Sequence, residues 1–259
     1  MKYILALLTI LLLTSCSKTN NELNIVPVPK ETIDLGMVIT EDMIGLIMGN
    51  QWRNKYGFTR PNSFEVISWS SGGISGQNSY YTLFNHGGPH VDAPIHYGMS
   101  GGLEIYTVES FTGPLRVFDV SEFEIGRTVD IDVFQDQGLN SGDIVLIYTN
   151  YKPPAEDEMP QSITLTRGAA EYLAEIPIRA YGTDSYSVGS KDPRAVDADT
   201  ELARSAPIHE AFLSKQIPIY EQLHNVNQLL GKDNMVFTGV PLIIEKGDGM
   251  IVHPVVFVY

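Results

Sequence analysis

The sequence predicts an α/β domain built around a mixed β-sheet. Short apolar runs typical of strands alternate with segments of helical spacing, which is the pattern of a sheet covered by helices. Strand-like segments also follow one another directly at both ends of the chain, where a wholly parallel sheet needs helical crossovers. After the first 30 residues, about 230 remain without an internal repeat or a long linker, so we expect a single domain.

The expected strands are runs rich in β-branched and aromatic residues, bounded by turn residues. They comprise residues 33–39, 64–69, 79–84, 115–120, 143–148, 179–181, 217–220, 235–238 and 251–259. The expected helices comprise residues 40–48, 131–137, 166–176 and 209–215. Thr40 is suited to cap the first helix, and helix 166–176 carries small apolar side chains near helical spacing. Segments 64–69 and 79–84 are predicted to pair with each other.

The N-terminal segment has the pattern of a secretory signal peptide. Lys2 is followed by an apolar run over residues 3–13 that is too short to span a bilayer comfortably. Leu13-Thr14-Ser15-Cys16 resembles the bacterial lipobox, whose cysteine is lipidated; the alternative for this cysteine is a free thiol. We expect a lipoprotein signal peptide over residues 1–15 and a flexible tether over 16–30. The protein is then held at the bacterial cell envelope through Cys16, facing the periplasm or the exterior.

The net charge argues against nucleic acids and anionic lipid surfaces as binding partners. The chain carries a formal charge of −14 at pH 7, whereas nucleic acids and anionic lipid surfaces are bound by basic patches. We therefore expect no nucleic-acid partner, and membrane contact only through the lipid anchor. The single cysteine excludes an intrachain disulfide.

A dense cluster of metal-ligand side chains lies between His86 and His96. This segment holds three of the six histidines of the chain, together with Asp92. Gly87-Gly88-Pro89 prevents an ordinary helix, and His90 and Asp92 fall on one face of an extended segment. Imidazole and carboxylate ligands suit a borderline divalent cation such as zinc or manganese. The alternative is a histidine-rich turn with local hydrogen bonds.

A metal site on one loop usually needs ligands from elsewhere in the chain. His209 begins a helical segment, and Glu221 follows the expected strand 217–220. From spacing alone, His209 and Glu221 are equally compatible with a role as metal ligands and with an ordinary structural role. The polar loop 182–187 follows a strand, where α/β sheets bind ligands, but an Asx or Ser/Thr turn explains it equally. For His224 and His253 we expect no role in the site.

The loop resembles the His-x-Gly-Thr-His-x-Asp-x-Pro-x-His signature of the cyclase family, which contains bacterial kynurenine formamidase and isatin hydrolase. The positions in register are His86, Gly88, His90, Asp92, Pro94 and His96, and Pro89 replaces the family threonine. Three further segments resemble the family in the same order: Gly182-x-Asp184-x-x-Ser187, His209 with Glu221 and Asn225, and a closing hairpin over 239–249. The resemblance covers most of the chain from residue 33 to residue 259.

This resemblance implies a swivelling β/β/α domain over residues 31–259, assembled as a homodimer or a larger homo-oligomer. It implies that His86, His90 and Asp92 bind a divalent metal, with Asp92 able to bridge two ions. His209 and Glu221 complete the second ion's ligands in members that bind two, and His96 is the general acid/base. Pro89 removes a hydroxyl and an N–H from the ligand loop, which places metal number and affinity in question.

The chemistry expected of such a site is metal-dependent hydrolysis of a non-peptide C–N bond. Metal-bound hydroxide attacks the carbonyl of a small aromatic amide, lactam or lactone, and His96 transfers the proton. The chain contains no His-Glu-x-x-His sequence, so zincin chemistry lacks a candidate. Two alternatives stay open: a non-catalytic surface lipoprotein that binds a metal or a ligand, and a cyclase or dehydratase using the same metal.

Overall fold

The computed structural model describes residues 27–41, 43, 54–55, 57, 59–155, 158, 160–189 and 201–259, the last with side chains from residue 207 onward. The predicted signal peptide, most of the tether and most of the predicted helix 40–48 lie outside the described residues. Within them, no helix is both long and apolar enough to cross a bilayer.

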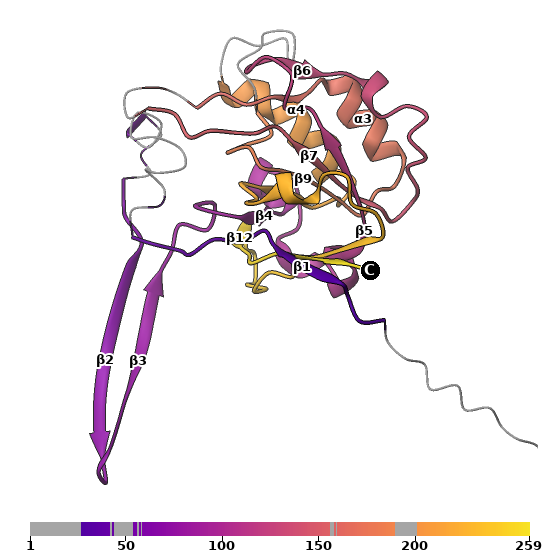
Figure 1. Cartoon of the computed structure of the whole chain (residues 1–259). Helices are drawn as coiled ribbons and strands as arrows, with labels where there is room; N and C mark the ends of the chain where they lie inside the picture. Colours follow the sequence, from indigo (N-terminus) through magenta and orange to yellow (C-terminus); the bar gives the residue numbers. More distant parts are fainter. Residues whose placement is uncertain are drawn as a thin grey trace, which may run out of the picture.

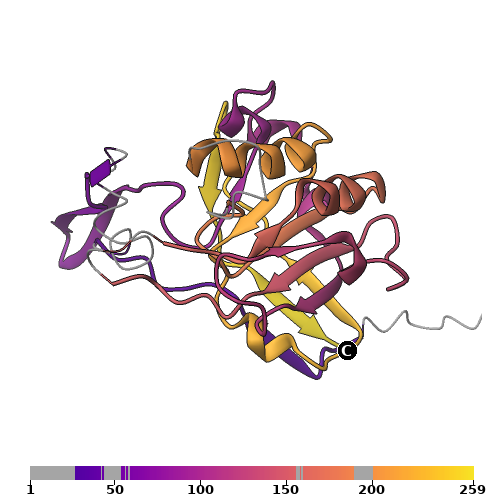
Figure 2. The same ribbon diagram turned by 90° about the horizontal axis from the view of Figure 1, so that it is seen from above.

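A nine-stranded mixed sheet forms the body of the protein (Figures 1 and 2). Its strands, in spatial order, are β1 (Glu31–Asp34), β13 (Val255–Val258), β11 (Met235–Thr238), β5 (Thr112–Asp119), β7 (Ile144–Tyr148), β9 (Ala180–Thr183), β10 (Ile219–Glu221), β4 (His90–Asp92) and β12 (Gly249–Ile251). Strands β5, β7, β9 and β10 run parallel, and the strands on either side of them pair antiparallel. The predicted α/β fold with a mixed sheet and a single domain is confirmed.

Both faces of this sheet are covered, and for this reason the sequence of β7 is continuously apolar. Ile144 and Leu146 belong to one core cluster, whereas Val145 and Ile147 belong to the other. Successive side chains of a strand point to opposite faces, so a strand buried on both faces carries no polar alternation.

Two helices lie over one face of the sheet, and short 3-10 turns cover the other (Figure 1). The helices are α3 (Arg167–Glu175) and α4 (Glu201–Leu213), which pack against each other. The turns of the opposite face are η2 (Leu103–Ile105), η3 (Val108–Phe111) and η5 (Val226–Leu229). Thr166, which the sequence analysis places inside this helix, caps α3 by accepting a hydrogen bond from the Ala169 N–H at 3.1 Å.

Three expected elements are shorter or divided, each for a local reason. The predicted helix 131–137 is only the 3-10 turn η4 (Ile131–Val133), because Asp136 adopts φ 58°, which a right-handed helix excludes. The predicted strand 33–39 ends at Asp34, whose carboxylate accepts a hydrogen bond from the Gly36 N–H at 2.7 Å and turns the chain. The predicted strand 251–259 is interrupted at Pro254, which has no N–H for the ladder.

The expected closing hairpin over residues 239–249 is wrong. Strand β11, which precedes this segment, pairs with β13 and β5, whereas β12, which ends it, pairs with β4. The segment therefore links two distant places in one sheet, and it brings residue 248 to the edge beside β4.

The predicted pairing of 64–69 with 79–84 is confirmed, and the hairpin is longer than expected. Strands β2 (Ser63–Ser71) and β3 (Ile74–Thr82) pair antiparallel over their full length and project away from the sheet (Figure 1). Gly72 and Gly73 form the turn with φ 59° and 80°, the left-handed backbone that a two-residue type I′ hairpin requires. Two small strands, β6 (Thr128–Val129) and β8 (Thr164–Leu165), pair with each other near α3.

Candidate metal centre

Strand pairing brings three of the predicted ligands to one face of the sheet. Strand β4 lies between β10 and β12, and His90 is directly opposite Glu221. Val91 and Tyr220 belong to the core on the far side, so their neighbours His90, Asp92 and Glu221 point to the side that α4 covers. His209 lies on α4 between the buried Ile208 and Phe212 and faces the same place.

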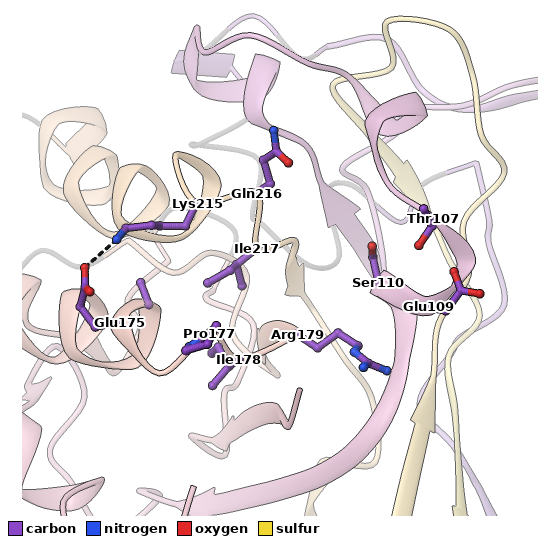
Figure 3. Close-up of a pocket in the computed structure, with 11 residues that line it drawn as sticks. Thr107, Glu109, Ser110, Glu175, Pro177, Ile178, Arg179, Lys215, Gln216 and Ile217 are labelled. Atoms are coloured by element: carbon purple, nitrogen blue, oxygen red, sulfur yellow. Dashed lines mark hydrogen bonds and ion pairs between the residues drawn. The ribbon is translucent and has the colours of Figure 1, made fainter. Parts of the chain in front are cut away.

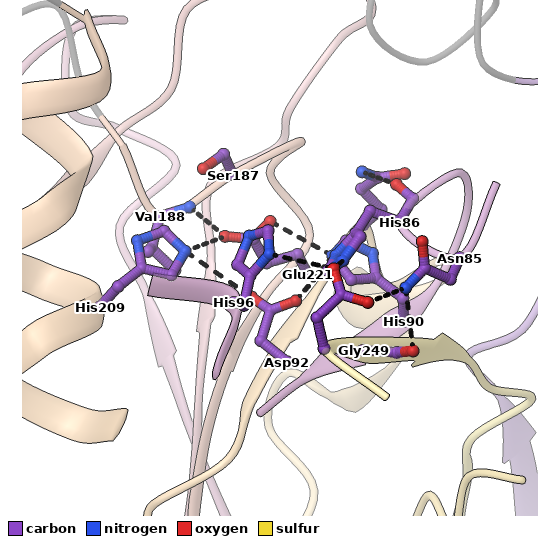
Figure 4. A network of polar contacts seen from close by, with 12 residues as sticks. Asn85, His86, His90, Asp92, His96, Ser187, Val188, His209, Glu221 and Gly249 are labelled. Carbon is purple, nitrogen blue, oxygen red and sulfur yellow. Dashed lines mark hydrogen bonds and ion pairs between the residues drawn. The ribbon is translucent and has the colours of Figure 1, made fainter. Parts of the chain in front are cut away.

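The side chains predicted as metal ligands converge in a buried cluster (Figure 4). Asp92 Oδ1 lies 3.0 Å from His86 Nδ1 and 3.3 Å from His90 Nε2, whereas Asp92 Oδ2 lies 3.6 Å from His209 Nε2. Glu221 Oε2 lies 3.5 Å from His90 Nε2, and its Oε1 lies 3.4 Å from His209 Nε2. Each carboxylate therefore uses its two oxygens toward different histidines.

The electrostatics of the cluster are those of a buried network of opposite charges. Burial lowers the pKa of His90 and of His209, but the neighbouring carboxylates of Asp92 and Glu221 outweigh it and raise these values to about 10 and about 9. Burial and the charge of Asp92 raise the pKa of Glu221, yet the two histidines bring it down to about 2. Burial raises the pKa of Asp92 as well, and the surrounding histidines hold it well below its ordinary value.

The donor set fits a divalent cation. His86 Nδ1 and both carboxylate oxygens of Asp92 are buried and lack a hydrogen-bond partner, although His86 Nδ1 and Asp92 Oδ1 lie 3.0 Å apart. The ligand atoms of His86, His90 and Asp92 all lie within 4.8 Å of one another. His90 Nδ1 lies 2.8 Å from the Gly88 carbonyl, which fixes the proton there and leaves Nε2 free to coordinate. Zinc and manganese both accept this mixture of imidazole and carboxylate.

His96 borders the cluster on its more open side. It lies in the 3-10 turn η1 (Pro94–Tyr97), which Gly98 ends with φ 73°. Its ring stacks on His86 at 4.1 Å, and its side chain is 29% exposed while His90 and His209 are at 1%. Ligand atoms of Asp92, His96 and His209 also lie within 4.8 Å of one another, so His96 is near enough to act on a group bound at the cluster.

Asp248 is a site residue that the sequence reasoning missed. Its Oδ2 lies 3.0 Å from His86 Nε2 and 3.6 Å from His96 Nδ1, and Asn85 Nδ2 donates to its Oδ1 at 2.7 Å. Hydrogen bonds from His86 and His96 hold the pKa of this half-exposed carboxyl far below its ordinary value. The signal in the sequence is Gly247-Asp248-Gly249, which the resemblance places in a closing hairpin and not in the site.

Gln222 is a second missed residue, and its amide is fully used. Its Oε1 accepts a hydrogen bond from the Gly88 N–H at 2.8 Å, and its Nε2 donates to the carbonyls of His86 at 3.0 Å and Tyr186 at 3.1 Å. The side chain is buried and follows Glu221 directly, with φ 60°. The residue that follows β10 therefore holds the backbone on both sides of Gly87.

The polar loop 182–187 supports the site without supplying a ligand side chain. Asp184 accepts hydrogen bonds from the N–H groups of Thr149 and Tyr151 and from the Thr149 hydroxyl, and burial raises its pKa. Just after the loop, the Val188 N–H donates to Glu221 Oε1 at 2.6 Å (Figure 4). Asp184 thus ties this loop to the segment that follows β7 by long-range hydrogen bonds, and not by the local Asx turn of the alternative interpretation.

Other candidate features lie apart from the cluster. His253 pairs with Asp34 at 2.8 Å on the surface, consistent with the expectation that it has no part in the site. A surface cavity of about 480 Å³ is lined by Arg179 and Lys215 among others, and it includes none of the metal-cluster residues (Figure 3). Its Lys215 is already paired with Glu175 at 2.6 Å.

The mixed sheet and the buried donor set define a metal-dependent enzyme. Residues 33–190 match the family described as "Putative cyclase", and the chain belongs to that family. It is 30% identical over 199 residues to a kynurenine formamidase of Bacillus cereus, covering 76% of this chain and 87% of the relative. A kynurenine formamidase of Salinibacter ruber is 30% identical over 175 residues, covering 67% and 76%.

Solved structures share the fold. Isatin hydrolase A from Labrenzia aggregata, bound to benzyl benzoate, superposes with a TM-score of 0.69 at 21% identity, covering 88% of this chain and 93% of that one. A potential metal-dependent hydrolase with cyclase activity superposes with a TM-score of 0.61 at 21% identity, covering 88% and 98%.

Proposed function

We propose that this protein hydrolyses the C–N bond of a small aromatic amide, either an aryl formamide such as N-formylkynurenine or a cyclic amide such as isatin. The observation that carries the proposal is the convergence of His86, His90, Asp92, His209 and Glu221 beside a more open His96. Kynurenine formamidases among the relatives support an amide substrate. The chain is a hydrolase of C–N amide bonds, and a lactone remains a related candidate substrate.

The proposed metal ligands fall into two overlapping groups. His86, His90 and Asp92 would hold one divalent ion, and His209 and Glu221 together with Asp92 would hold a second. This division is supported by Asp92, whose Oδ1 lies near His86 and His90 while its Oδ2 lies near His209. A zinc or manganese ion in this place supplies a Lewis acid that acidifies a bound water and polarises a carbonyl.

His96 is proposed to hold and return the proton. Its ring lies against His86 at 4.1 Å and is partly open to solvent, so a substrate can reach it. As general base it accepts a proton from the attacking water, and as general acid it gives that proton to the leaving nitrogen. Asp248 Oδ2, 3.6 Å from His96 Nδ1, favours the orientation in which Nε2 faces the reaction.

The test is hydrolysis of N-formylkynurenine and isatin by protein loaded with zinc or manganese. We expect His96→Ala to retain its metal and to lose activity by about 100-fold or more, the usual contribution of a general acid/base. Asp92→Ala is expected to lose both metal and activity, and His253→Ala, a substitution on the surface, is the matched control. Wild-type turnover in both site variants would refute the mechanism.

The same assay separates hydrolysis from the alternatives. A product heavier than the substrate by one water indicates hydrolysis, whereas a product of equal or lower mass indicates cyclisation or dehydration. Metal binding with no turnover of any amide, lactam or lactone in the panel indicates a binding protein.

We also propose that the chain is a lipoprotein of the bacterial cell envelope, with a signal over 1–15, lipidation at Cys16 and a tether over 16–30 ahead of the domain 31–259. The support is the lipobox-like Leu13-Thr14-Ser15-Cys16 sequence. Cys16→Ser is expected to move the protein from the membrane fraction to the soluble one and to abolish fatty-acid labelling. Unchanged fractionation and absence of label in the wild type would refute the anchor.

A further inference from the structure

Two consecutive rings of the turn η1 lie on two different histidines of the metal cluster. The His96 ring stacks on His86, with 4.1 Å between the ring centroids and 24° between the ring planes. The next ring along the chain, that of Tyr97, stacks on His209 with 3.8 Å and 16°. One short turn therefore contacts both groups of proposed ligands, the group around His86 and the group around His209.

The Tyr97 ring also touches the proposed acid/base. His96 and Tyr97 lie edge to face, with 5.1 Å between the ring centroids and 73° between the planes. The centroids of His96 and His209 are 5.9 Å apart. The three rings thus form one contact group. Rings packed in this way hold one another's orientation, because tilting one of them loses contact area with its neighbours.

The place of His209 depends on tertiary packing more than that of the ligands on β4 does. His90 and Asp92 come from this paired strand, whereas His209 comes from helix α4. His209 Nε2 lies 3.6 Å from Asp92 Oδ2 and 3.4 Å from Glu221 Oε1. Metal–ligand distances tolerate deviations of only about 0.2 Å, so a small rotation of the His209 ring removes it from a shared ion. The Tyr97 ring covers the face of this imidazole.

The backbone of η1 fixes where Tyr97 lies. The His96 N–H donates a hydrogen bond to the Ala93 carbonyl at 2.9 Å. The Met99 N–H donates to the Pro94 carbonyl at 3.2 Å, and Pro94 begins the turn with its preset φ. On its other side, Tyr97 packs against the core cluster that includes buried side chains of α4. The turn and the helix are therefore held against each other through the tyrosine.

We infer that Tyr97 is a positioning residue for the second ion: its ring holds the His209 imidazole where Nε2 reaches the two carboxylates. Because Tyr97 also packs on His96, it links the geometry of this ligand to that of the acid/base. The link to His96 rests on the proposed function, whereas the role at His209 requires only that the cluster binds two divalent ions. The stack is made by ring faces, so phenylalanine at position 97 supplies it equally.

The role at His209 is tested by calorimetric titration of the metal-free full chain with zinc. The wild type is expected to bind zinc in two steps, and His209→Ala identifies the step that needs His209. Tyr97→Leu and Tyr97→Met keep an apolar side chain but remove the ring. Each is expected to weaken this step by about 10- to 100-fold, as loss of an interaction that orients a ligand does. The other step is expected to stay as in the wild type, and Tyr97→Phe to keep both.

The matched control is Tyr172→Leu. Tyr172 lies on α3 and packs, partly buried, against the same core cluster as Tyr97. Its replacement is expected to leave both zinc steps unchanged, which separates the role at His209 from a general loosening of the core. Circular dichroism checks that every variant keeps its fold.

Proton NMR of the metal-free protein reports the stack directly. The His209 ring signals, identified by their absence in His209→Ala, are expected to be shifted upfield by the ring that covers them. Tyr97→Leu is expected to lose this shift and Tyr97→Phe to keep it. A wild type that lacks the shift contradicts the stack in solution and overturns the inference.

Hydrolysis of N-formylkynurenine at saturating zinc tests the link to His96. Tyr97→Leu is expected to lower kcat by about 10- to 100-fold with KM unchanged, because a catalytic group displaced by about 1 Å costs up to that much. An unchanged kcat overturns this link. If the wild type binds zinc in two steps but hydrolyses no amide, the proposed function fails and the link with it, while the titration still decides the role at His209. A single zinc step in the wild type, equal loss in both steps, the same loss in Tyr172→Leu, or a Tyr97→Phe variant as weak as Tyr97→Leu overturns that role.

Discussion

Replacing Gln222 by alanine tests whether the ligand loop, residues 86–96, depends on hydrogen bonds from a residue outside it. The buried amide makes hydrogen bonds to the Gly88 N–H and to the carbonyls of His86 and Tyr186, and alanine removes all three. A net contribution of about 1 kcal/mol for each bond predicts a loss of about 3 kcal/mol in the free energy of unfolding. The three backbone groups would be left buried, so the loss should not fall below this figure.

Metal affinity gives the second readout of the same variant. Freed from the amide, the backbone at His86 can rotate its ring away from Asp92, which now lies 3.0 Å from it. Loss of an interaction that orients a ligand typically weakens metal binding by about 10- to 100-fold. We therefore expect Gln222→Ala to bind zinc that much more weakly in competition with a chromophoric chelator.

The control is Gln228→Ala, since this glutamine lies exposed in η5 and is not one of the residues of the metal cluster. It is expected to match the wild type in urea unfolding and in zinc affinity. The reasoning would be refuted if the free energy of unfolding of Gln222→Ala stayed within about 0.5 kcal/mol of the wild type, the usual range for a surface substitution, and zinc affinity were unchanged. The ligand loop would then keep its conformation without the Gln222 side chain.

Further expectations concern the same site. Asp248→Ala should weaken zinc binding by about 10- to 100-fold and Asp248→Asn should retain most of it, because an amide oxygen still accepts from the His86 ring; equal loss in both would contradict this. In the metal-free protein the pKa values of His90 and His209 are raised from 6.5 to about 10 and about 9. The stability that they contribute is therefore present below pH 6.5 and lost as the pH rises through 9 to 10, which urea unfolding with and without zinc will show. Chelation should lower the melting temperature, since a bound ion stabilises the folded state alone. Pro89→Thr should change zinc affinity less than threefold, and a larger gain would show that the absent hydroxyl matters.

Local patterns predicted much of this centre, and long-range pairing supplied the rest. The two-residue spacing of His90 and Asp92 correctly placed both on one face, because side chains alternate along a strand. Glu221 could not be assigned from spacing, since its position opposite His90 depends on the pairing of β10 with β4, strands far apart in the chain. His209 likewise depends on where α4 packs.

The missed residues share a physical reason. Gln222 and Asp248 act on the ligands through side chains that have no metal-binding pattern of their own. The length and direction of the β2–β3 hairpin were also not predicted, although its strands were. Alternation identifies a strand, but it does not show whether a pair of strands joins the main sheet or leaves it.

The way in which the loop is held explains why proline is tolerated at position 89, where the family signature has threonine. A threonine there offers a hydroxyl and an N–H, and proline offers neither. The Pro89 carbonyl still accepts a hydrogen bond from the Val252 N–H at 2.8 Å, which ties the loop to the end of β12. Proline also fixes φ and limits the freedom of the unfolded loop. Gln222 holds the backbone of the loop, and Asp248 holds the ring of His86. The metal ligands are therefore oriented by the rigid Pro89 and by these two distant side chains, and they do not depend on a hydroxyl within the loop.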